Sequence, residues 1–308
     1  MEIYSTLTQE LRAACPGLEV REYEPMKNHT TFRVGGPARL MALPRSEEEA
    51  VAAVRIAAGL GLESVFMGNG SNLLVSDAGV DAFIVKAHDG LGEITRTGEW
   101  ELTAGSGVLL SRLANFACDL GLTGLEFAHG IPGTVGGAVT MNAGAYGGEM
   151  CEAVEQTRYL TGSGEIASLQ GEEHDFSYRH SAFSDGKRLI LSSTFRLAPG
   201  DSAAIRARID ELMERRRSKQ PLEMPSAGST FKRPEGHFAA ALIEQCGLKG
   251  TRVGGAQVSE KHAGFVINRE DATCADILAL VALVRETVLR ETGVVLEMEV
   301  RTLGPMPR

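Results

Sequence analysis

Residues 124–148 read GLEFAHGIPGTVGGAVTMNAGAYGG, and this stretch gives the strongest indication of how the chain folds. It contains eight glycines in 25 residues, no lysine or arginine, and a single carboxylate, Glu126. Each glycine loses extra conformational entropy on folding, so something must hold a loop this rich in glycine. Exposed backbone N–H groups without side-chain cations are typical of a loop that cradles a pyrophosphate. The alternative interpretation is a glycine-rich connection between domains that binds nothing.

A second glycine loop, residues 68–73 (GNGSNL), directly follows a predicted strand at residues 64–67. Glycine at positions 68 and 70 permits a positive φ and a close approach of the backbone. Consecutive N–H groups in such a turn can bind an anion, although an ordinary turn is the alternative. Neither loop has the spacing G-x-G-x-x-G between a strand and a helix, so neither predicts a Rossmann dinucleotide site.

The rest of the chain mixes helical and strand patterns, which predicts an α+β or α/β fold. Ser46 followed by Glu49 fits a capping box at the start of one helix. Helices are expected at residues 1–20, 46–61, 108–120, 201–219, 238–246 and 273–291. Strands are expected at residues 64–67, 82–87, 99–104, 153–160, 189–197, 256–259, 264–267 and 294–302. A basic run at 215–219, followed by Pro221, suggests a domain boundary near residues 200–220.

The composition is that of a globular protein, because 43% of the 308 residues are hydrophobic and 23% are charged. The net charge of −9 argues against a general nucleic-acid binder or a protein that binds anionic membranes. Five cysteines without C-x-x-C spacing predict reduced thiols rather than disulfides or a zinc site. The sequence contains neither a recognisable signal peptide nor a membrane span, which predicts a cytoplasmic location.

Three further segments carry reactive side chains, and each allows two interpretations. Arg179 follows Tyr178 in a predicted loop, where an arginine is usually a solvated charge. Ser229 lies outside any G-x-S-x-G pattern, so it is either a proton donor or a loop serine bonded to backbone, and no hydrolase nucleophile is indicated. In the predicted strand 294–302, alternation places Glu297 and Glu299 on the face opposite an apolar one, either solvated or directed into a site.

Eight segments, in order along nearly the whole chain, closely resemble those of the UDP-N-acetylenolpyruvoylglucosamine reductases, the flavoenzymes that complete UDP-N-acetylmuramate in peptidoglycan synthesis. They are NHTTFRVGG (28–36), GNGSNL (68–73), GIPGTVGGA (130–138), MNAGAYG (141–147), SYRHS (177–181), GSTFK (228–232), LIEQCGL (242–248) and GGAQVSEKHA (254–263). Any one of these segments could arise by chance, whereas all of them in sequence make a strong signal.

The resemblance implies an α+β fold of the vanillyl-alcohol-oxidase (PCMH) type. In that fold two α+β subdomains bind FAD, and a C-terminal α+β domain binds the substrate. The FAD-binding region is expected at residues 1–200, with subdomains at about 1–90 and 91–200. The substrate-binding domain is expected at residues 201–293, and residues 294–308 are expected to form a strand that returns to the flavin side.

The resemblance also implies which residues bind FAD and which are catalytic. FAD, without a covalent bond to the protein, would contact residues of the two glycine loops: Gly68, Asn69, Gly70, Ser71, Asn72, Leu73, Gly130, Ile131, Gly133, Thr134, Gly136, Gly137, Asn142 and Gly144. Arg179 matches the arginine that stabilises the enolate, and Ser229 matches the serine that protonates the substrate carbon. Glu299, rather than Glu297, matches the catalytic glutamate.

Longer members of the family carry a tyrosine-bearing insertion that caps the substrate. The segment between Arg179 and Ser229 is too short for it, so the chain resembles the shorter subclass. Substrate contacts are therefore expected from Tyr178, Arg217, Gln220 and Lys232, with Arg216 and Lys219 as further candidates for the UDP diphosphate. The alternative for the basic residues is that they are solvated at the end of a helix, where the helix dipole favours positive charge.

The implied activity is the NADPH-dependent, FAD-mediated reduction of the enolpyruvyl ether of UDP-N-acetylglucosamine to UDP-N-acetylmuramate. The implied partners are this substrate and NADPH, with no metal, nucleic acid or membrane, and a monomer is favoured. One alternative is an FAD oxidase of the same fold that uses O₂. Such oxidases often tether FAD covalently, and His29, His88 and His129 lie in no recognisable tether context. A non-catalytic flavin protein is the other alternative, but it would have little reason to keep all three catalytic matches.

Overall fold

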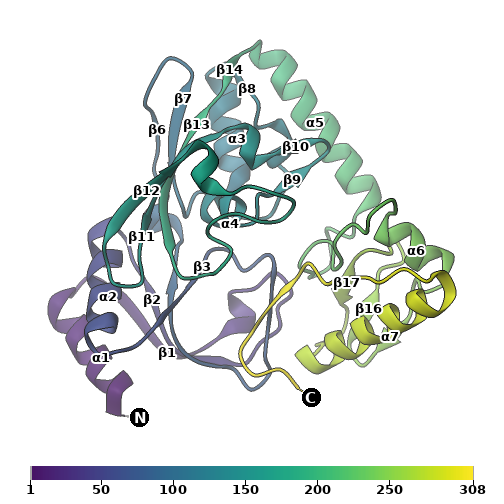
Figure 1. Ribbon diagram of the computed structural model, residues 1–308, viewed down its shortest axis with the longest axis horizontal. Coiled ribbons are helices and arrows are strands. Elements are labelled where there is room, and N and C mark those ends of the chain that lie inside the picture. The colour runs from purple at the N-terminus through teal and green to yellow at the C-terminus, as the bar shows by residue number, and fades with distance from the viewer. Residues whose placement is uncertain (1, 308) are drawn as a thin grey trace. The chain divides into compact units, whose positions relative to one another are not determined.

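The computed structural model describes residues 2–307, which divide into two compact units (Figure 1). The first unit comprises residues 2–22, 39–69 and 82–215, and the second comprises residues 23–38, 70–81 and 216–307. Two short segments from the first part of the chain therefore belong to the same unit as the C-terminal residues. The predicted domain boundaries at residues 200 and 293 stay predictions.

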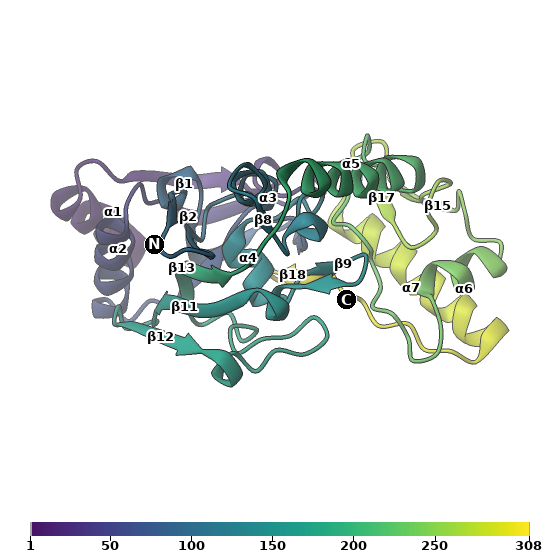
Figure 2. The ribbon, with the colours of Figure 1, turned by 90° about the horizontal axis from the view of Figure 1, so that it is seen from above.

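Four strands form a sheet that belongs mainly to the first unit, in the order β1 (Glu19–Pro25), β2 (Pro37–Leu43), β5 (Val80–Lys86) and β3 (Ser64–Met67). Strands β3 and β5 run parallel. Helices α1 (Glu2–Ala14) and α2 (Glu47–Gly59) lie side by side next to this sheet (Figures 1 and 2). The helices and the sheet share one hydrophobic core, to which Leu7, Val54 and Phe83 contribute fully buried side chains.

The other sheet of the first unit is antiparallel throughout, with the order β12 (Ile166–Gln170), β11 (Val154–Leu160), β13 (Leu189–Arg196), β7 (Glu101–Gly105) and β6 (Ile94–Arg96). Helices α3 (Leu110–Asp119) and α4 (Val135–Thr140) bury their apolar side chains in the core of this sheet. Helix α5 (Ser202–Lys219) follows the sheet along the chain. Short pairs join β8 (Leu122–Thr123) to β14 (Ala198–Pro199) and β9 (Gly144–Ala145) to β10 (Gly148–Glu149).

The second unit is built around helix α7 (Cys274–Thr292), which packs on a sheet of β15 (Arg252–Val253), β16 (Ala256–Val258) and β17 (Val266–Asn268) (Figure 1). Helix α6 (Ala239–Gln245) joins the same core. A parallel pair, β4 (Leu73–Val75) with β18 (Arg301–Leu303), connects residues more than two hundred positions apart. Phe32 and Leu74 bury their side chains in this core, so residues from three chain segments form it.

Local signals account for the ends of two long helices. The Ser46 hydroxyl accepts a hydrogen bond from the backbone N–H of Glu49 at 3.3 Å, which is one half of the capping box predicted for α2. The Glu49 carboxylate accepts from the N–H of Arg45 at 2.7 Å instead of completing the box. At α7, Thr273 and Asp276 form a full capping box. Gly293 ends that helix with φ of 73°, a left-handed conformation that glycine adopts without a steric penalty.

Two predicted elements need correction. The helix predicted at residues 1–20 ends at Ala14, and strand β1 begins at Glu19. Only Arg301–Leu303 forms a strand in the segment predicted as strand 294–302; its preceding residues make a single isolated bridge, Met298 to Phe231. The predicted alternation holds as a burial pattern, because Leu296 and Val300 are buried whereas Val295 is exposed. That pattern is satisfied by packing on the core, with the two backbone hydrogen bonds of the isolated bridge in place of a continuous ladder. Strands β1, β2 and β12 were not predicted.

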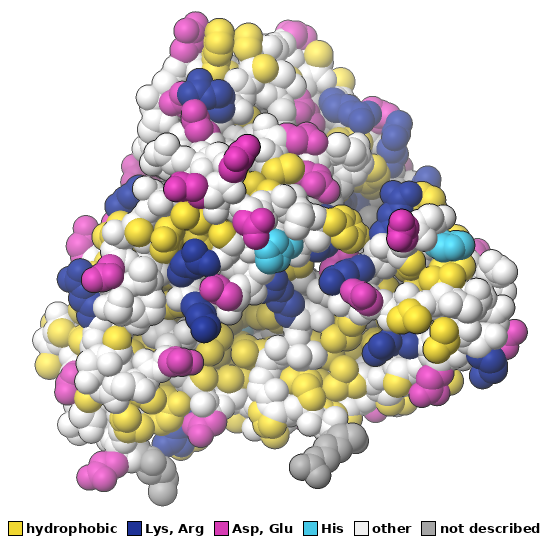
Figure 3. Space-filling view, viewed as in Figure 1, with side chains coloured by type: hydrophobic (Ala, Val, Ile, Leu, Met, Phe, Trp, Pro, Cys, Tyr) yellow, Lys and Arg dark blue, Asp and Glu magenta, His cyan; other side chains and the backbone are white. Residues whose placement is uncertain are grey.

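Among residues 2–307, no helix is both long and apolar enough to cross a membrane. On the face shown in Figure 3, basic and acidic side chains are interspersed and neither sign forms a continuous field. This mixture fits the modest net charge of −9 for a chain of 308 residues.

A buried histidine supports the segment that leads to the predicted catalytic arginine. His174 has no exposed surface and stacks on Phe176 with a centroid distance of 4.9 Å. Its Nδ1–H donates to the carbonyl of Gly171 at 3.0 Å, so its Nε2 accepts from the hydroxyl of Thr157 at 2.9 Å. Burial disfavours the charged imidazole and lowers the pKa of His174 below its ordinary value.

We expect this histidine to make folding pH-dependent. As the pH falls below about 6.5, the unfolded chain binds a proton at this side chain before the folded protein does, so the folded state loses stability. The difference in unfolding free energy between the parent protein and His174→Gln should therefore shrink by up to about 1.4 kcal/mol per pH unit below that value. Urea titrations between about pH 7.5 and 5 measure this difference; two parallel pH profiles would contradict it.

Candidate active site

In the first unit, the two glycine loops meet directly. The side chain of Asn69 donates a hydrogen bond from Nδ2 to the carbonyl of Pro132 at 2.8 Å. A Cβ atom on Gly68 would lie 2.3 Å from Oγ1 of Thr134, so only glycine allows this approach. The sequence named both loops from separate motifs, and the structure brings residues 68–69 and 130–134 together.

The remainder of the GNGSNL motif belongs to the second unit. Gly70 has φ of 62°, and a Cβ there would lie 2.2 Å from the carbonyl oxygen of His29. Asn72 donates from Nδ2 to the carbonyl of Glu299 at 3.2 Å, and Leu73 begins β4, where it pairs with Arg301. One motif therefore supplies residues to both units, which are joined here by the bond between Asn69 and Gly70.

Buried polar atoms without partners line the glycine loops of the first unit. Ser106 is 1% exposed and Thr134 is 4% exposed, and neither hydroxyl has a hydrogen-bond partner among residues 2–307. The backbone places them near each other, because the N–H of Gly136 donates to the carbonyl of Ser106 at 2.9 Å. A third unpartnered buried atom is Nε2 of His88. His88 lies beside the segment that carries Ser106, since a Cβ on Gly107 would lie 1.8 Å from the His88 carbonyl oxygen.

These orphan groups fit a polar cofactor. Buried hydroxyls are normally hydrogen-bonded, so an unpaired cluster beside glycine-rich backbone is expected where a ligand supplies the missing partners. The hydroxyls and ribityl or pyrophosphate oxygens of FAD offer such partners. The sequence did not suggest Ser106 or His88 as candidate binding residues, although the glycines on both sides of Ser106, at 105 and 107, were an available signal.

The other predicted FAD residues of the first unit have varied surroundings. Gly133 is buried, with its carbonyl accepting from the N–H of Leu110 at 3.1 Å, whereas Gly137 is exposed. Gly130, Ile131 and Gly136 are partly buried.

Arg179 lies in a tight turn of the first unit. Ser177 and His180 exchange backbone hydrogen bonds of 3.1 Å in both directions and so close the turn. Arg179 has φ of 57°, which is unusual for a residue other than glycine. Its guanidinium donates from Nη2 to the carbonyl of Gly144 at 3.2 Å and lies over the ring of Tyr178 at 4.9 Å. Tyr178 is 47% exposed and is therefore accessible to a ligand.

In the second unit, the structure brings the segments of Ser229 and Glu299 together. The N–H of Glu299 donates to the carbonyl of Thr230 at 2.8 Å, and the N–H of Lys232 donates to the carbonyl of Glu297 at 2.8 Å. Ser229 is exposed and Glu299 is half-buried. Arg179 belongs to the other unit, so its predicted place beside these two residues stays a prediction.

The two glutamates that the sequence could not separate have different surroundings. Glu297 is 69% exposed and forms an ion pair with Lys232, Oε2 to Nζ at 3.2 Å. An exposed pair of this kind contributes little to stability. Glu299 is less exposed, and its backbone receives the Asn72 amide, so it lies on the segment that contacts the GNGSNL motif.

The remaining substrate candidates lie at the end of α5. Arg217 and Lys219 are exposed, whereas Arg216 is only 9% exposed. Gln220 is half-buried and its N–H donates to the carbonyl of Arg216 at 2.8 Å. Arg217 and Lys219 are therefore available to an anion, and the buried Arg216 is less so.

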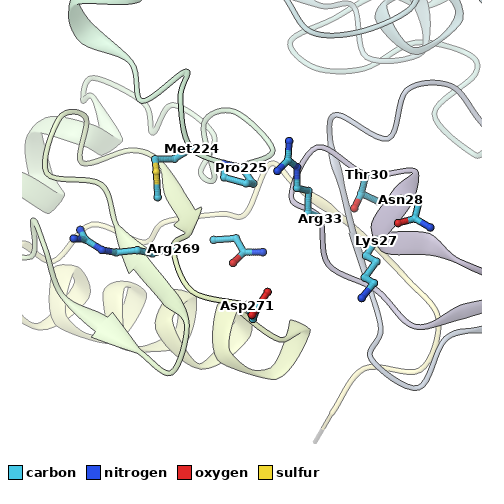
Figure 4. A pocket seen from close by; sticks show the side chains of 9 residues that line it. Lys27, Asn28, Thr30, Arg33, Met224, Pro225, Arg269 and Asp271 are labelled. Atoms are coloured by element: carbon cyan, nitrogen blue, oxygen red, sulfur yellow. The ribbon is translucent and has the colours of Figure 1, made fainter.

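A separate pocket of about 600 Å³ lies within the second unit and contains none of the predicted site residues. Figure 4 shows Lys27 and Arg33 on one side of it, and Arg269 and Asp271 on the other. The three cationic side chains point in different directions in this view, so they do not converge on one point.

Comparison with known proteins first identifies the class of protein to which the fold belongs. A model described as "FAD binding domain" matches residues 38–170, which include both glycine loops and the orphan hydroxyls. Alkyldihydroxyacetonephosphate synthase shares the fold, with a TM-score of 0.50 and 17% identity over 64% of this chain and 41% of that one. The chain thus has a vanillyl-alcohol-oxidase-type FAD-binding fold followed by a C-terminal domain, as the sequence predicted.

The particular family follows from the whole length of the chain. The C-terminal domain model of UDP-N-acetylenolpyruvoylglucosamine reductase matches residues 220–303. The reductase of Clostridium novyi (strain NT) is 47% identical, covering 97% of this chain and 96% of its own. That of Geobacillus kaustophilus (strain HTA426) is 44% identical, covering 99% of each. The crystal structure of the Thermus caldophilus enzyme superposes with a TM-score of 0.79, at 34% identity over 93% of this chain and 98% of that one. The chain belongs to the UDP-N-acetylenolpyruvoylglucosamine reductase family.

Proposed function

We propose that this chain reduces the enolpyruvyl ether of UDP-N-acetylglucosamine to UDP-N-acetylmuramate, with NADPH as the reductant and FAD as the cofactor. It is an FAD-dependent oxidoreductase of peptidoglycan synthesis, like the family to which it belongs. The observation that carries the proposal is the pair of glycine loops in contact, with the unpartnered hydroxyls of Ser106 and Thr134 buried beside them. An oxidase of the same fold gains no support from any particular residue.

The cofactor is proposed to be held by backbone and by buried hydroxyls. When bound, FAD accepts a hydride from NADPH and supplies it to the vinyl group of the substrate. Gly68 and Gly136 let the loops pack closely against Thr134 and Ser106, whose hydroxyls would donate to the cofactor the hydrogen bonds that they lack within the protein. Leu73 and Asn72 of the second unit continue the same motif.

Arg179 is proposed to stabilise the negative charge that develops on the substrate carboxylate and its neighbouring carbon. A fixed guanidinium in a site that excludes water can lower such a barrier by several kcal/mol. The bond from Nη2 to the Gly144 carbonyl keeps the guanidinium in place before the substrate arrives. Tyr178, stacked on that guanidinium, is proposed to contact the same end of the substrate.

Ser229 is proposed as the general acid that protonates the substrate carbon. A serine hydroxyl is a weak acid, so this role requires a strongly basic enolate and a well-directed hydroxyl. Glu299 is proposed to orient the intermediate or to relay the proton to Ser229, since its segment pairs with the Ser229–Phe231 segment. Arg217, Gln220 and Lys232 are proposed to bind the UDP diphosphate.

The activity can be tested on the purified yellow protein without oxygen. NADPH should bleach the flavin absorbance, and the enolpyruvyl sugar nucleotide should restore it with formation of UDP-N-acetylmuramate. If only oxygen restores the colour, the protein is an oxidase and the proposal is wrong.

We expect FAD to be bound without a covalent bond, because no tether is recognisable and the orphan groups are hydrogen-bonding ones. Precipitation with acid should therefore leave the yellow colour in the supernatant. A yellow pellet after washing would contradict this prediction.

We further propose that the protein is a monomer located in the cytoplasm. Sedimentation analysis of the purified protein would test its oligomeric state.

A further inference from the structure

A buried asparagine joins the two loops around Arg179. Asn142 is 1% exposed, and its Nδ2 donates to the carbonyl of Ser177 and to Oε2 of Glu149, each at 3.1 Å. Its Oδ1 accepts from the N–H of Cys151 at 2.9 Å. The amide thus uses both donor hydrogens and one acceptor position within the protein, which leaves little capacity for a ligand.

We propose that Asn142 is a positioning residue for Arg179, rather than a contact of the cofactor. Asn142 anchors the turn that carries Arg179 to the hairpin formed by β9 and β10. This inference rests on the proposed function, which assigns Arg179 its role, and it adds the residue through which that role is maintained.

The hydrogen bonds hold the arginine at both of its ends. At the backbone end, Ser177 closes the turn with His180, and the Ser177 carbonyl is bound by Asn142. At the other end, the guanidinium binds the carbonyl of Gly144, the first residue of β9. Gly144 pairs with Glu149, the second partner of the Asn142 amide. The β9–β10 hairpin therefore holds both ends of Arg179: the guanidinium directly, and the backbone turn through Asn142.

The backbone conformations show why an anchor is needed. Arg179 has φ of 57° and Asn142 has φ of 41°, both in the left-handed region. Asparagine tolerates this region better than other residues with a side chain, whereas arginine has no such advantage. Strained residues persist only where the surrounding structure holds them. Without the bond to Ser177, the turn can relax and the guanidinium loses its fixed position.

The central experiment compares Asn142→Ala with a matched control, Ser184→Ala. Ser184 also makes hydrogen bonds beside this turn: its hydroxyl donates to the carbonyl of Thr140 at 3.2 Å and accepts from the N–H of Ser181 at 3.0 Å. In Asn142→Ala we expect reoxidation of the flavin by the enolpyruvyl substrate to slow about 10- to 100-fold, because small misplacements of a catalytic group have effects of this size. Reduction by NADPH should change less than about twofold, and the control should match the parent enzyme in both steps.

A double-mutant cycle then separates positioning from general damage. If Asn142 acts through Arg179, adding Asn142→Ala to Arg179→Ala should slow reoxidation no further. Affinity of the oxidised enzyme for the substrate, measured by calorimetry, should fall no further in the double variant than in Arg179→Ala. Should alanine impair folding, Asn142→Gly removes the same side-chain bonds without the strain at a positive φ.

The outcomes distinguish the possible failures. Additive losses in the double variant, or equal slowing of both half-reactions, would show that Asn142 acts on the fold and not through Arg179. Weaker FAD binding in Asn142→Ala, with Arg179→Ala normal in this respect, would return Asn142 to the cofactor site. If Arg179→Ala itself leaves reoxidation unchanged, the role of Arg179 in the proposed function is wrong, independently of the bonds made by Asn142.

Discussion

Replacing Ser229 with alanine is expected to slow reoxidation of the reduced flavin by the enolpyruvyl substrate by roughly 10²–10⁴-fold, the usual contribution of a general acid. Bleaching by NADPH should remain nearly unchanged, because that half-reaction delivers a hydride and needs no proton from this hydroxyl. Ser229 is exposed and outside the hydrophobic core, so the substitution should leave folding intact. Anaerobic stopped-flow absorbance measures the two half-reactions separately.

Ser226→Ala is the matched control for this experiment. Ser226 lies three residues earlier, and it accepts the hydroxyl of Thr31 through its backbone carbonyl at 2.6 Å, which alanine retains. Both half-reactions should be unaffected in the control. If Ser229→Ala slows the two half-reactions by the same factor, Ser229 has a structural role and is not the proton donor.

Glu299→Gln is expected to impair turnover far more than Glu297→Gln, with FAD retained in both variants. Glutamine keeps the shape and hydrogen-bonding capacity of the side chain but cannot ionise, so the variant isolates the charge or proton relay. Glu299 is half-buried on the segment paired with Thr230, next to the proposed acid. Loss of a proton relay is expected to slow reoxidation by roughly 10²-fold or more.

Glu297→Gln provides the comparison within the same segment. Its side chain is 69% exposed and forms an ion pair with Lys232. Breaking an exposed ion pair changes stability by about 1 kcal/mol at most. Measurements of steady-state turnover and flavin content in both variants would decide which of the two glutamates is catalytic. A silent Glu299→Gln with a damaging Glu297→Gln would move the catalytic carboxylate by two residues.

The sequence predicted most of the helices because their signals are local. Ser46 and Glu49 mark the start of α2, and Gly293 marks the end of α7, where each residue acts on its own helix. Strands β1 and β12 were missed because few of their side chains are buried, which leaves no strong apolar alternation, even though β12 pairs with the neighbouring β11. Strand β2 was missed because it is buried along most of its length and so does not alternate. The apolar alternation of residues 294–300 was interpreted as a strand, but periodicity reports burial and cannot report which backbone groups pair.

The candidate site could be named from motifs but not assembled from them. The contact between Asn69 and Pro132 joins two loops that the sequence had already singled out. In contrast, no local pattern indicated that Ser106 is buried without a partner or that Asn142 binds the Ser177 carbonyl. Both facts depend on which distant segments become neighbours, and a motif contains no information about its neighbours in space.

The interleaved composition of the second unit has a consequence for how the protein is made. Phe32 and Leu74 share a core with α7, and the Asn268 amide binds the Phe32 carbonyl at 3.0 Å across 236 positions of sequence. Asp77 caps α7 through the N–H groups of Cys274 and Ala275. During synthesis on the ribosome, residues 23–38 and 70–81 emerge early and must wait for partners that are translated last. Because such long loops must close before these contacts form, we expect the second unit to fold more slowly than the first. A nascent chain stalled before α7 would expose these apolar side chains.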